Sequence, residues 1–516
     1  MAARIAIVLL FILVNVVIGY WSSRRVRNVG DFFIAGRKVG PWVSAFAFGT
    51  TYFSAVLFIG YAGKLGWGFG MNTLWIAVGN VLVGALLAWL ILAKRTRFMT
   101  ARLDAITMPE FLRARYAWPA FRSISAVVVF IFLVPYSASA YQGLAYLFEQ
   151  NLGVNYLTAC GLMALITGVY LLMGGYLAVT LTDFFQGLIQ IVGVIIMVVL
   201  IAAPVGGVLS AVAQGSLPQN APALAAPGPI PGWLTLVSLV LITSLGVWGM
   251  PQMVQKFYSI KRKRDILPAT IITTLFCGLV AGGAYFTGGM SHLLLQASQL
   301  PFDPKLEPDK IVPFMLFTHM PPWFTVLILL IVLAASMSTL ASLVLVSSAA
   351  ISVDLLGYRV KGEDADPQGV LVLRVLCGVF VGVSVVLAAC RISFIVNMMA
   401  FSWGALAGFF IAPYLYGLFW KGATRTGAVV ASFVGLAIAV GLPIFMRFPT
   451  PDGGLIPIAK SPIIPVASAL AMIVPLLVLP LVSAFTRQLP AEHLAKVFAA
   501  DEDEEDEVAP PESQTG

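Results

Sequence analysis

The chain of 516 residues is 59% hydrophobic and only 10% charged, whereas soluble domains carry about 25% charged residues. Its net charge of +8 would suit a nucleic-acid partner, but the cations stand mostly in short segments between apolar stretches. The composition therefore argues against both a soluble domain and nucleic-acid binding. It predicts a polytopic membrane protein whose surroundings are a lipid bilayer.

Thirteen apolar stretches, each of about 18 to 28 residues, are long enough to cross a hydrocarbon core of roughly 30 Å. They lie near residues 3–20, 41–63, 73–93, 121–147, 155–174, 182–204, 233–253, 268–289, 323–350, 370–389, 393–419, 427–446 and 462–484. The first has no small-residue cleavage site before Arg24, so we expect a retained helix rather than a removable signal peptide. We predict an all-α polytopic membrane protein with about 13 transmembrane helices.

Lysine and arginine are distributed unevenly between two alternating sets of loops. Twenty-four of the 31 Lys and Arg residues fall in one set, and the other set holds only Arg4, Lys64, Lys305, Lys310, Arg391, Arg447 and Lys460. Cytoplasmic loops carry the excess of cations. We therefore expect the N-terminus outside and the C-terminus in the cytoplasm, in a plasma or inner membrane.

A single transmembrane domain is expected over residues 1–487, with its core at about 41–419. Residues 205–232 are rich in Ala, Pro and Gly and carry no charge, which indicates an extracellular loop. From residue 488 the chain leads into an acidic run at 501–507. Such like charges repel one another and cannot bury a core, so residues 488–516 are predicted to form a disordered cytoplasmic tail.

The sequence contains no motif typical of an enzyme. There is no H-E-x-x-H, no Walker loop and no nucleophile elbow. A passive channel fits poorly as well, because no ring of charges or filter-like repeat is visible. We therefore expect a transporter and not an enzyme, with no obligate protein partner evident.

Two predicted spans, five helices apart and opposite in direction, contain weak helix formers. The span 41–63 contains Gly49-Thr50-Thr51, and the span 233–253 contains Gly246, Gly249 and Pro251. In a helix interior glycine costs about 1 kcal/mol and proline about 3 kcal/mol relative to alanine. Paired interruptions are typical of transporters built from inverted repeats, whose substrate site lies at the broken helices. Close helix packing is the alternative explanation for the glycines.

The most polar run inside an apolar span is at residues 333–342. Ala335, Ser338, Thr339 and Ser342 follow the spacing i, i+3, i+4, i+7 and share one helix face. Hydroxyls and freed helix carbonyls can replace the water shell of a sodium ion without a full negative charge. Alternatively, these hydroxyls bond back to carbonyls of the same helix and serve packing.

Asp183 is the carboxylate at the mouth of the span 182–204. An acid at the membrane is a functional candidate, either as an ion ligand or as a proton carrier. Together with Thr180 and Thr182 it could equally cap the N-terminus of this helix. Both interpretations stay open at the level of the sequence.

The run G-G-Y-L-A-V-T-L-T-D-F-F-Q-G at residues 174–187 resembles the signature of the sodium:solute symporter family. Four further stretches resemble it in order, at 31–37, 251–256, 335–348 and 419–421. The resemblance implies a five-plus-five inverted-repeat fold, with helices two to eleven as the core and helices one, twelve and thirteen outside it. It also implies Na+ as the coupling ion for solutes such as proline, pantothenate, sugars, sialic acid or monocarboxylates.

The resemblance further implies a sodium site. Its expected ligands are carbonyl oxygens of Thr50, Phe53 and Ala335 and side-chain oxygens of Ser338 and Thr339. Some members of the family hold a second ion with the acid at the position of Asp183 and hydroxyls at the positions of Ser338, Ala341 and Ser342. Alanine has no side-chain oxygen, so this second site is weakened here.

A substrate cavity is implied as well. Its expected wall residues are Thr51, Tyr52, Ser54, Trp75, Asn80, Tyr136, Tyr141, Gln142, Trp248, Gln252, Asn397, Ser402 and Trp403. Proline carriers of the family have an aspartate at the position of Tyr52, which argues against a simple proline assignment. No Lys or Arg is expected deep in these spans, so a small neutral, zwitterionic or singly carboxylated solute fits better than a strongly anionic one.

The sequence thus predicts sodium-coupled symport of a small organic solute resembling an amino acid, a vitamin or a monocarboxylate, by alternating access. Two alternatives remain. One is a proton-coupled transporter that uses Asp183, and the other is a transporter-like protein that senses its solute without moving it.

Overall fold

The computed structural model describes residues 2–23, 33, 37, 39–225, 228–296, 298, 300–358, 367–450 and 454–499. These residues form helices and connecting segments, and their only β contacts are two isolated bridges. The predicted all-α fold is confirmed. Ten described helices are long and apolar enough to cross a membrane, and Ala6–Ser22 and Tyr156–Gly168 are shorter apolar helices, so the count of thirteen is not established.

Every predicted span overlaps a helix of the structure. The principal helices are α1 (Ala2–Ser23), α3 (Pro41–Tyr52) with η2 (Val56–Leu65), α5 (Leu74–Gly79) with η4 (Asn80–Leu87) and η5 (Trp89–Ala93), α8 (Pro119–Leu152), α9 (Tyr156–Ala202), α12 (Gly232–Leu245) with η8 (Gly246–Gly249) and α13 (Pro251–Tyr258), α14 (Ile266–Gly289), α17 (Phe324–Ala349) with η12 (Ala350–Leu355), α18 (Pro367–Ala389), α19 (Ile395–Phe419), α20 (Arg425–Phe445) and α21 (Ile464–Ala484). Shorter helices connect them: α4 (Gly66–Phe69), η3 (Gly70–Thr73), α6 (Lys94–Arg102), α7 (Met108–Tyr116), η6 (Ala203–Val205), α10 (Val208–Gly215), η7 (Pro218–Asn220), α11 (Pro222–Ala225), η9 (Lys263–Asp265), α15 (Ser291–Leu294), η11 (Pro308–Lys310), α16 (Ile311–His319), η13 (Ile458–Lys460) and α22 (Ala491–Val497).

Both predicted helix interruptions are present. The first lies slightly later than expected: α3 continues through Gly49 and ends at Tyr52, and Phe53 is extended with φ −117° and ψ 120°. Gly49 serves packing instead, because a Cβ there would lie 2.3 Å from the ring of Phe276. The second break is at Met250, which is extended with φ −87° and ψ 118° and directly precedes Pro251 at the start of α13.

The predicted spans 155–174 and 182–204 together form α9, which bends at Gly175. This glycine has φ 58° and ψ −156°, a backbone conformation that residues with a Cβ rarely adopt. The bend separates the two apolar halves of α9, and Asp183 follows it by eight residues.

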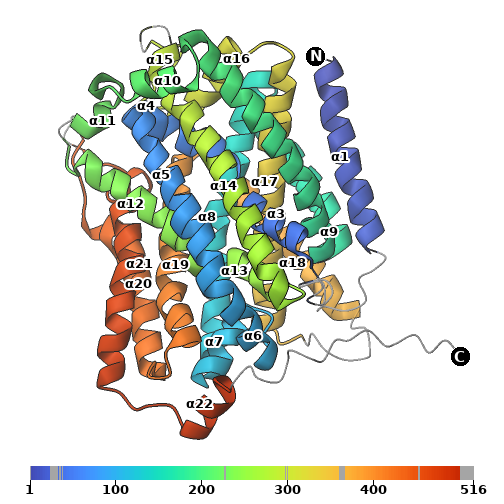
Figure 1. Ribbon diagram of the computed structural model, residues 1–516, viewed down its shortest axis with the longest axis vertical. Helices are drawn as coiled ribbons and strands as arrows, with labels where there is room; N and C mark the ends of the chain where they lie inside the picture. The colour runs from blue at the N-terminus through green and yellow to red at the C-terminus, as the bar shows by residue number, and fades with distance from the viewer. Residues whose placement is uncertain are drawn as a thin grey trace, which may run out of the picture.

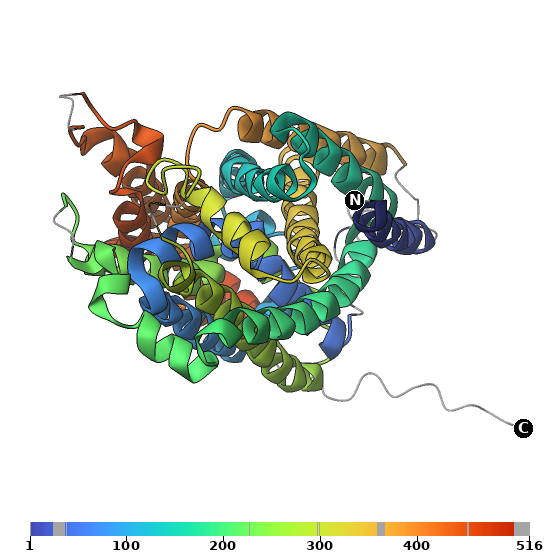
Figure 2. The same cartoon turned by 90° about the horizontal axis from the view of Figure 1, so that it is seen from above.

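The helix α17 runs through the interior of the bundle, as the view from above shows (Figure 2). It packs against α3, α8, α9 and α18. The helix α1 lies at one edge against α9, whereas α20 and α21 stand at the opposite edge against α19 (Figure 1). The first and the last two spans are therefore peripheral to the bundle that contains the broken helices.

Large apolar side chains are exposed on the outer helices, among them Leu90, Leu165, Val199, Leu275 and Leu477. Contiguous apolar surface of this extent is unfavourable in water and is expected where helices face lipid. With the apolar helices, it identifies a multi-pass membrane protein.

Two predicted connecting segments are more regular than expected. The loop 205–232 contains α10 and α11. Part of the predicted disordered tail is helical, because α22 occupies residues 491–497, and the buried Val497 and partly buried Phe498 attach it to the bundle. The acidic run 501–507 lies outside the described residues.

Candidate functional site

The end of α3 meets the middle of α17 through hydrogen bonds between hydroxyls and backbone carbonyls. The hydroxyl of Ser338 donates to the carbonyl oxygen of Thr50 at 2.9 Å. The hydroxyl of Thr339 reaches the carbonyl oxygens of Thr51 at 3.1 Å and Thr50 at 3.3 Å. Both hydroxyls also lie near the carbonyl oxygen of Ala335, at 2.9 and 3.1 Å. Five oxygen atoms therefore gather where α3 ends.

The break in α3 explains why these carbonyls are available. The last four carbonyls of an α-helix have no partner within the helix, and α3 ends only two residues after Thr50. Thr50, Thr51, Ser338 and Thr339 are all at most 1% exposed. Buried carbonyls without helical partners require either a donor or a cation. The hydroxyls supply donors here, and after rotation they would present oxygen lone pairs to an ion.

These oxygens fit a sodium ion by their chemistry. They are hard, uncharged and supplied by a freed helix end and two hydroxyls, which is how broken helices of secondary transporters hold sodium. The structure brings together four of the five predicted sodium residues, Thr50, Ala335, Ser338 and Thr339. The fifth, Phe53, lies at the break itself and lines the neighbouring cavity.

A cavity lies beside the break. It is lined by Tyr52, Phe53, Ser54, Val56, Leu57, Tyr61, Asn80, Tyr136, Thr243, Tyr285 and Met399. None of these lining residues carries a charge. Aromatic faces, hydroxyls and one amide therefore provide its recognition chemistry.

Tyr52 is fixed at one wall of this cavity. Its hydroxyl donates to the carbonyl oxygen of Thr243, and its ring stacks on Phe53 with ring centres 4.4 Å apart. Trp403 stacks behind Tyr52 at 6.2 Å and meets Tyr136 edge-on at 5.8 Å. Gly84 makes room for the Tyr52 hydroxyl, because a Cβ at Gly84 would lie 2.1 Å from it.

The predicted wall residues divide into three groups. Tyr52, Ser54, Asn80 and Tyr136 line the cavity, and Trp403 supports it from behind. Five others make hydrogen bonds outside the lining: Gln142, Trp248 and Ser402 donate to the carbonyls of Ser393, Val83 and Phe132, Asn397 accepts from Lys64, and Thr51 contacts Ser342. Tyr141 and Gln252 are buried and do not line the cavity. Trp75 is 64% exposed, because α5 turns Ile76 and Ala77 inward and this side chain outward.

Seven lining residues were not predicted for the wall. Phe53 had been assigned to the ion site, and Val56, Leu57, Tyr61, Thr243, Tyr285 and Met399 had no assignment. Tyr285 is the one tyrosine of the span 268–289, and Tyr61 shares the span 41–63 with Tyr52. A tyrosine inside an apolar span is the one signal that could have suggested them. Their convergence depends on how η2 and α14 pack together, and no local pattern encodes that.

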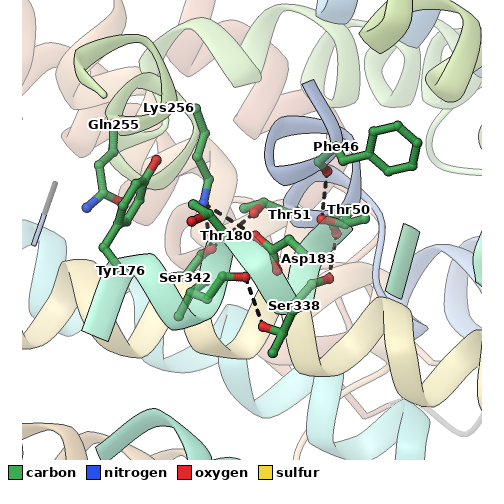
Figure 3. A network of polar contacts seen from close by, with 12 residues as sticks. Phe46, Thr50, Thr51, Tyr176, Thr180, Asp183, Gln255, Lys256, Ser338 and Ser342 are labelled. Atoms are coloured by element: carbon green, nitrogen blue, oxygen red, sulfur yellow. Dashed lines mark hydrogen bonds and ion pairs between the residues drawn. The ribbon is translucent and has the colours of Figure 1, made fainter. Parts of the chain in front are cut away.

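A second polar cluster surrounds Asp183 (Figure 3). The ammonium of Lys256 on α13 lies 3.8 Å from a carboxylate oxygen of Asp183 and donates to the hydroxyl of Ser342 at 3.0 Å. Ser342 also shares a hydrogen bond of 3.0 Å with Thr51. The expectation that no Lys or Arg lies deep among these helices is therefore wrong: the break at Met250 starts α13 inside the bundle and carries Lys256 to full burial.

Polar contacts join the helices at both ends of the bundle. At one end Arg37 donates to the carbonyls of Tyr258 and Ala105, at 3.1 and 2.9 Å. At the other end Lys64 donates to Asn397 at 3.0 Å. These contacts connect the broken helices to their neighbours on either side of the cavity.

Asp309 belongs to the Lys64 end and lies in the connecting segment η11. It accepts a hydrogen bond of 3.2 Å from the backbone N–H of Ile395, at the start of α19. Burial raises the pKa of Asp309 to about 6, although this hydrogen bond and the nearby Lys64 act in the opposite direction.

A bundle of apolar helices with two broken members, one of them broken beside a cavity, is typical of a membrane transporter. The sequence model of the sodium:solute symporter family matches residues 32–435. The chain belongs to this family, whose members are transporters and not enzymes.

Individual relatives agree with this assignment. The chain is 28% identical over 435 residues to the osmoregulated proline transporter OpuE of Bacillus subtilis, covering 83% of this chain and 86% of that protein. It is 30% identical over 444 residues to a sodium/proline symporter of Salmonella typhimurium, covering 82% and 84%. Its fold matches a Na+-coupled sialic acid symporter with a TM-score of 0.70 at 16% identity, over 94% of this chain and 98% of the other.

Proposed function

We propose that this protein moves a small organic solute across the cell membrane together with sodium, by alternating access. One observation carries the proposal: carbonyl oxygens of Thr50, Thr51 and Ala335 meet the hydroxyls of Ser338 and Thr339 at the broken end of α3. This set suits a monovalent cation, because it offers several oxygens and no formal charge.

The coupling follows from the position of the cavity. A sodium ion would hold the end of α3 against α17, and the next residues, Tyr52, Phe53 and Ser54, line the cavity. Ion and solute thus act on the same backbone break. By linkage, sodium tightens solute binding by the same factor by which solute tightens sodium binding. Each ion that enters across 100 mV contributes about 2.3 kcal/mol, which corresponds to roughly 50-fold accumulation.

The cavity wall favours a small zwitterion. The carboxylate of such a solute would face the sodium ion, and its ammonium group would lie against the faces of Tyr52, Tyr61, Tyr136 or Tyr285. The relatives named as proline transporters make proline the first solute to test. Tyr52 supplies an aromatic face where proline carriers of the family have a carboxylate, so a solute with a bulky ammonium group is a strong second choice.

We further propose that the protein lies in the plasma or inner membrane, with the N-terminus outside and the C-terminus in the cytoplasm. The cation-rich segments α6 and α7 support this orientation. Cys390 tests it, because it is the one exposed cysteine and lies in the opposite, cation-poor set of loops. A membrane-impermeant thiol reagent should label Cys390 on intact cells. If the reagent labels Cys390 only in inverted vesicles, the loop that contains Cys390 faces the cytoplasm and the proposed orientation is wrong.

The central experiment measures the melting temperature of the purified protein against amino acids including proline, vitamins, monocarboxylates and sugars. Each solute is tested in sodium and in choline at equal ionic strength. Stabilisation by one solute in sodium alone supports coupled binding and identifies the solute class. Stabilisation that ignores sodium would remove the symport proposal and direct attention to protons. Uptake into proteoliposomes then distinguishes transport from sensing.

A further inference from the structure

Lys256 places an ammonium group inside the bundle. Its side chain is buried, and its ammonium lies 3.0 Å from the hydroxyl of Ser342 and 3.8 Å from a carboxylate oxygen of Asp183. The ring of Tyr176 faces the same ammonium at 5.0 Å. A carboxylate, a hydroxyl and an aromatic face are the groups that bind a small cation.

An ionised Asp183 requires a cation at this point. It is fully buried, and within the described part of the chain neither of its carboxylate oxygens has a hydrogen-bond partner. Removing an ionised carboxylate from water costs several kcal/mol unless an opposite charge compensates it. The ammonium of Lys256 provides that charge from a different helix, α13 instead of α9 (Figure 3).

Ser342 links this cluster to the proposed sodium site. It accepts from Lys256 and shares a hydrogen bond of 3.0 Å with the hydroxyl of Thr51. The carbonyl of Thr51 in turn accepts from Thr339. A cation in the Asp183 cluster therefore affects the same end of α3 that the sodium ion would hold.

We propose that the ammonium of Lys256 takes the place of a second coupling ion at Asp183 and Ser342, so that the carrier moves one sodium ion per solute. The proposal rests on the proposed sodium symport and adds its stoichiometry. Lys256 has the charge of a sodium ion but is bound covalently to α13, so it stays with the protein through the transport cycle. Ala341, which offers no side-chain oxygen on this face of α17, agrees with a site that no longer binds a free ion.

The arrangement also gives Lys256 a part in coupling. The lysine joins α13, the second half of one broken helix, to α17 and α9, while Ser342 continues the contact to α3, the first half of the other broken helix. A free ion would connect these helices only while bound. The tethered ammonium connects them whenever α13 is in its present position.

The test counts sodium ions bound to purified full-length protein, with radioactive sodium as the probe and no solute added. Wild-type protein should bind about one ion per chain, and Lys256→Met should bind about two, a twofold rise, because the bare carboxylate of Asp183 then attracts a free cation. Lys256→Ala is prepared in parallel, since it leaves more room for an ion. Lys256→Arg retains the positive charge and should stay at the wild-type value.

The double variant Asp183→Asn/Lys256→Met is the matched control. It has no uncompensated buried charge, and its bound sodium should return to the wild-type value. Two ions bound by wild-type protein, or no rise in either Lys256→Met or Lys256→Ala, would overturn the role of Lys256 and leave the symport proposal intact. Wild-type protein that binds no sodium would instead overturn the symport proposal itself.

Discussion

The hydroxyl of Ser338 donates a hydrogen bond of 2.9 Å to the carbonyl oxygen of Thr50, and the two residues are 288 positions apart in the chain. This contact joins the broken end of α3 to the buried helix α17. It exists because α3 stops at Tyr52 and leaves its final carbonyls without helical partners. The proposed ion site therefore arises from a helix end inside the bundle and not from a charged side chain.

Removing either hydroxyl should weaken the response to sodium. We expect Ser338→Ala and Thr339→Ala to raise the sodium concentration for half-maximal solute uptake by roughly tenfold each, since a ligand interaction of about 1.4 kcal/mol is lost. Uptake against sodium concentration in proteoliposomes measures the effect. Ser348→Ala is the control, because that hydroxyl donates to the Val344 carbonyl of its own helix and makes no contact with Thr50 or Thr51, so the sodium response should stay unchanged. An unaltered response in both site variants would contradict the site.

The sequence was sufficient to predict the broken helices and the helix face shared by Ala335, Ser338 and Thr339, because both depend on local chemistry, whereas the role of these residues as sodium ligands stays a prediction. Pro251 and the glycines before it disfavour a continuous helix, and the spacing of Ala335, Ser338 and Thr339 sets one face of α17. The break in α3 lies after Tyr52 and not at Gly49 as predicted, because Gly49 makes room for the ring of Phe276 from another helix. A residue that serves packing and one that interrupts a helix cannot be distinguished by type alone.

The rest of the site depends on contacts between distant segments. The cations that follow Lys256 in the sequence predict a cytoplasmic loop, and only the start of α13 inside the bundle carries Lys256 to Asp183. Similarly, Tyr61 and Tyr285 reach the cavity through the packing of η2 against α14. Such positions follow from tertiary geometry, which no periodicity in the chain specifies.

Gly84 controls the shape of the cavity through Tyr52. In Gly84→Ala the new Cβ would lie 2.1 Å from the Tyr52 hydroxyl, so the ring must move toward the cavity. Overpacking of this kind costs about 1–3 kcal/mol, and we expect solute affinity to fall by roughly tenfold or more. Solute binding in sodium, measured by calorimetry, checks this prediction. The double variant Gly84→Ala/Tyr52→Phe removes the clashing hydroxyl and should recover part of the lost solute affinity. If the affinity does not recover, the clash with the Tyr52 hydroxyl is not the cause of the loss.

Asp309 should make stability depend on pH. Burial raises the pKa of this carboxyl from 3.8 to about 6 in the folded protein, so the folded state binds a proton more tightly than the unfolded state does. Its contribution to stability is therefore greatest below pH 3.8 and is lost as the pH rises through about 6. A pKa difference of this size corresponds to a change of about 3 kcal/mol in the free energy of unfolding.

Melting curves between about pH 5 and about pH 7.5 test whether Asp309 makes the protein more stable at the lower pH. Relative to Asp309→Asn, the wild-type protein should gain stability as the pH is lowered across this range. Asp303→Asn, which removes an exposed carboxylate of the same connecting segment, is the matched control and should not reproduce the difference. Equal pH slopes for wild type and Asp309→Asn would show that the Asp309 carboxyl is not the group responsible.

One aromatic ring among three cations helps to hold α22 against the bundle, beside the buried Val497 and the hydrogen bond of 3.1 Å between His493 and the Arg115 carbonyl. The ring of Phe498 lies 4.9 Å from the guanidinium of Arg115, 5.5 Å from that of Arg95 and 5.9 Å from the ammonium of Lys421. A cation–π contact is worth about 0.5–1 kcal/mol at an exposed site and about 2 kcal/mol or more for a desolvated cation such as the buried Arg115. Phe498→Ala removes all three and should release α22, and faster amide exchange in residues 491–497 would report this. Phe498→Leu keeps apolar contact but no π face. Its exchange should lie close to that of Phe498→Ala, whereas wild-type protection in Phe498→Leu would show that apolar packing alone holds the helix.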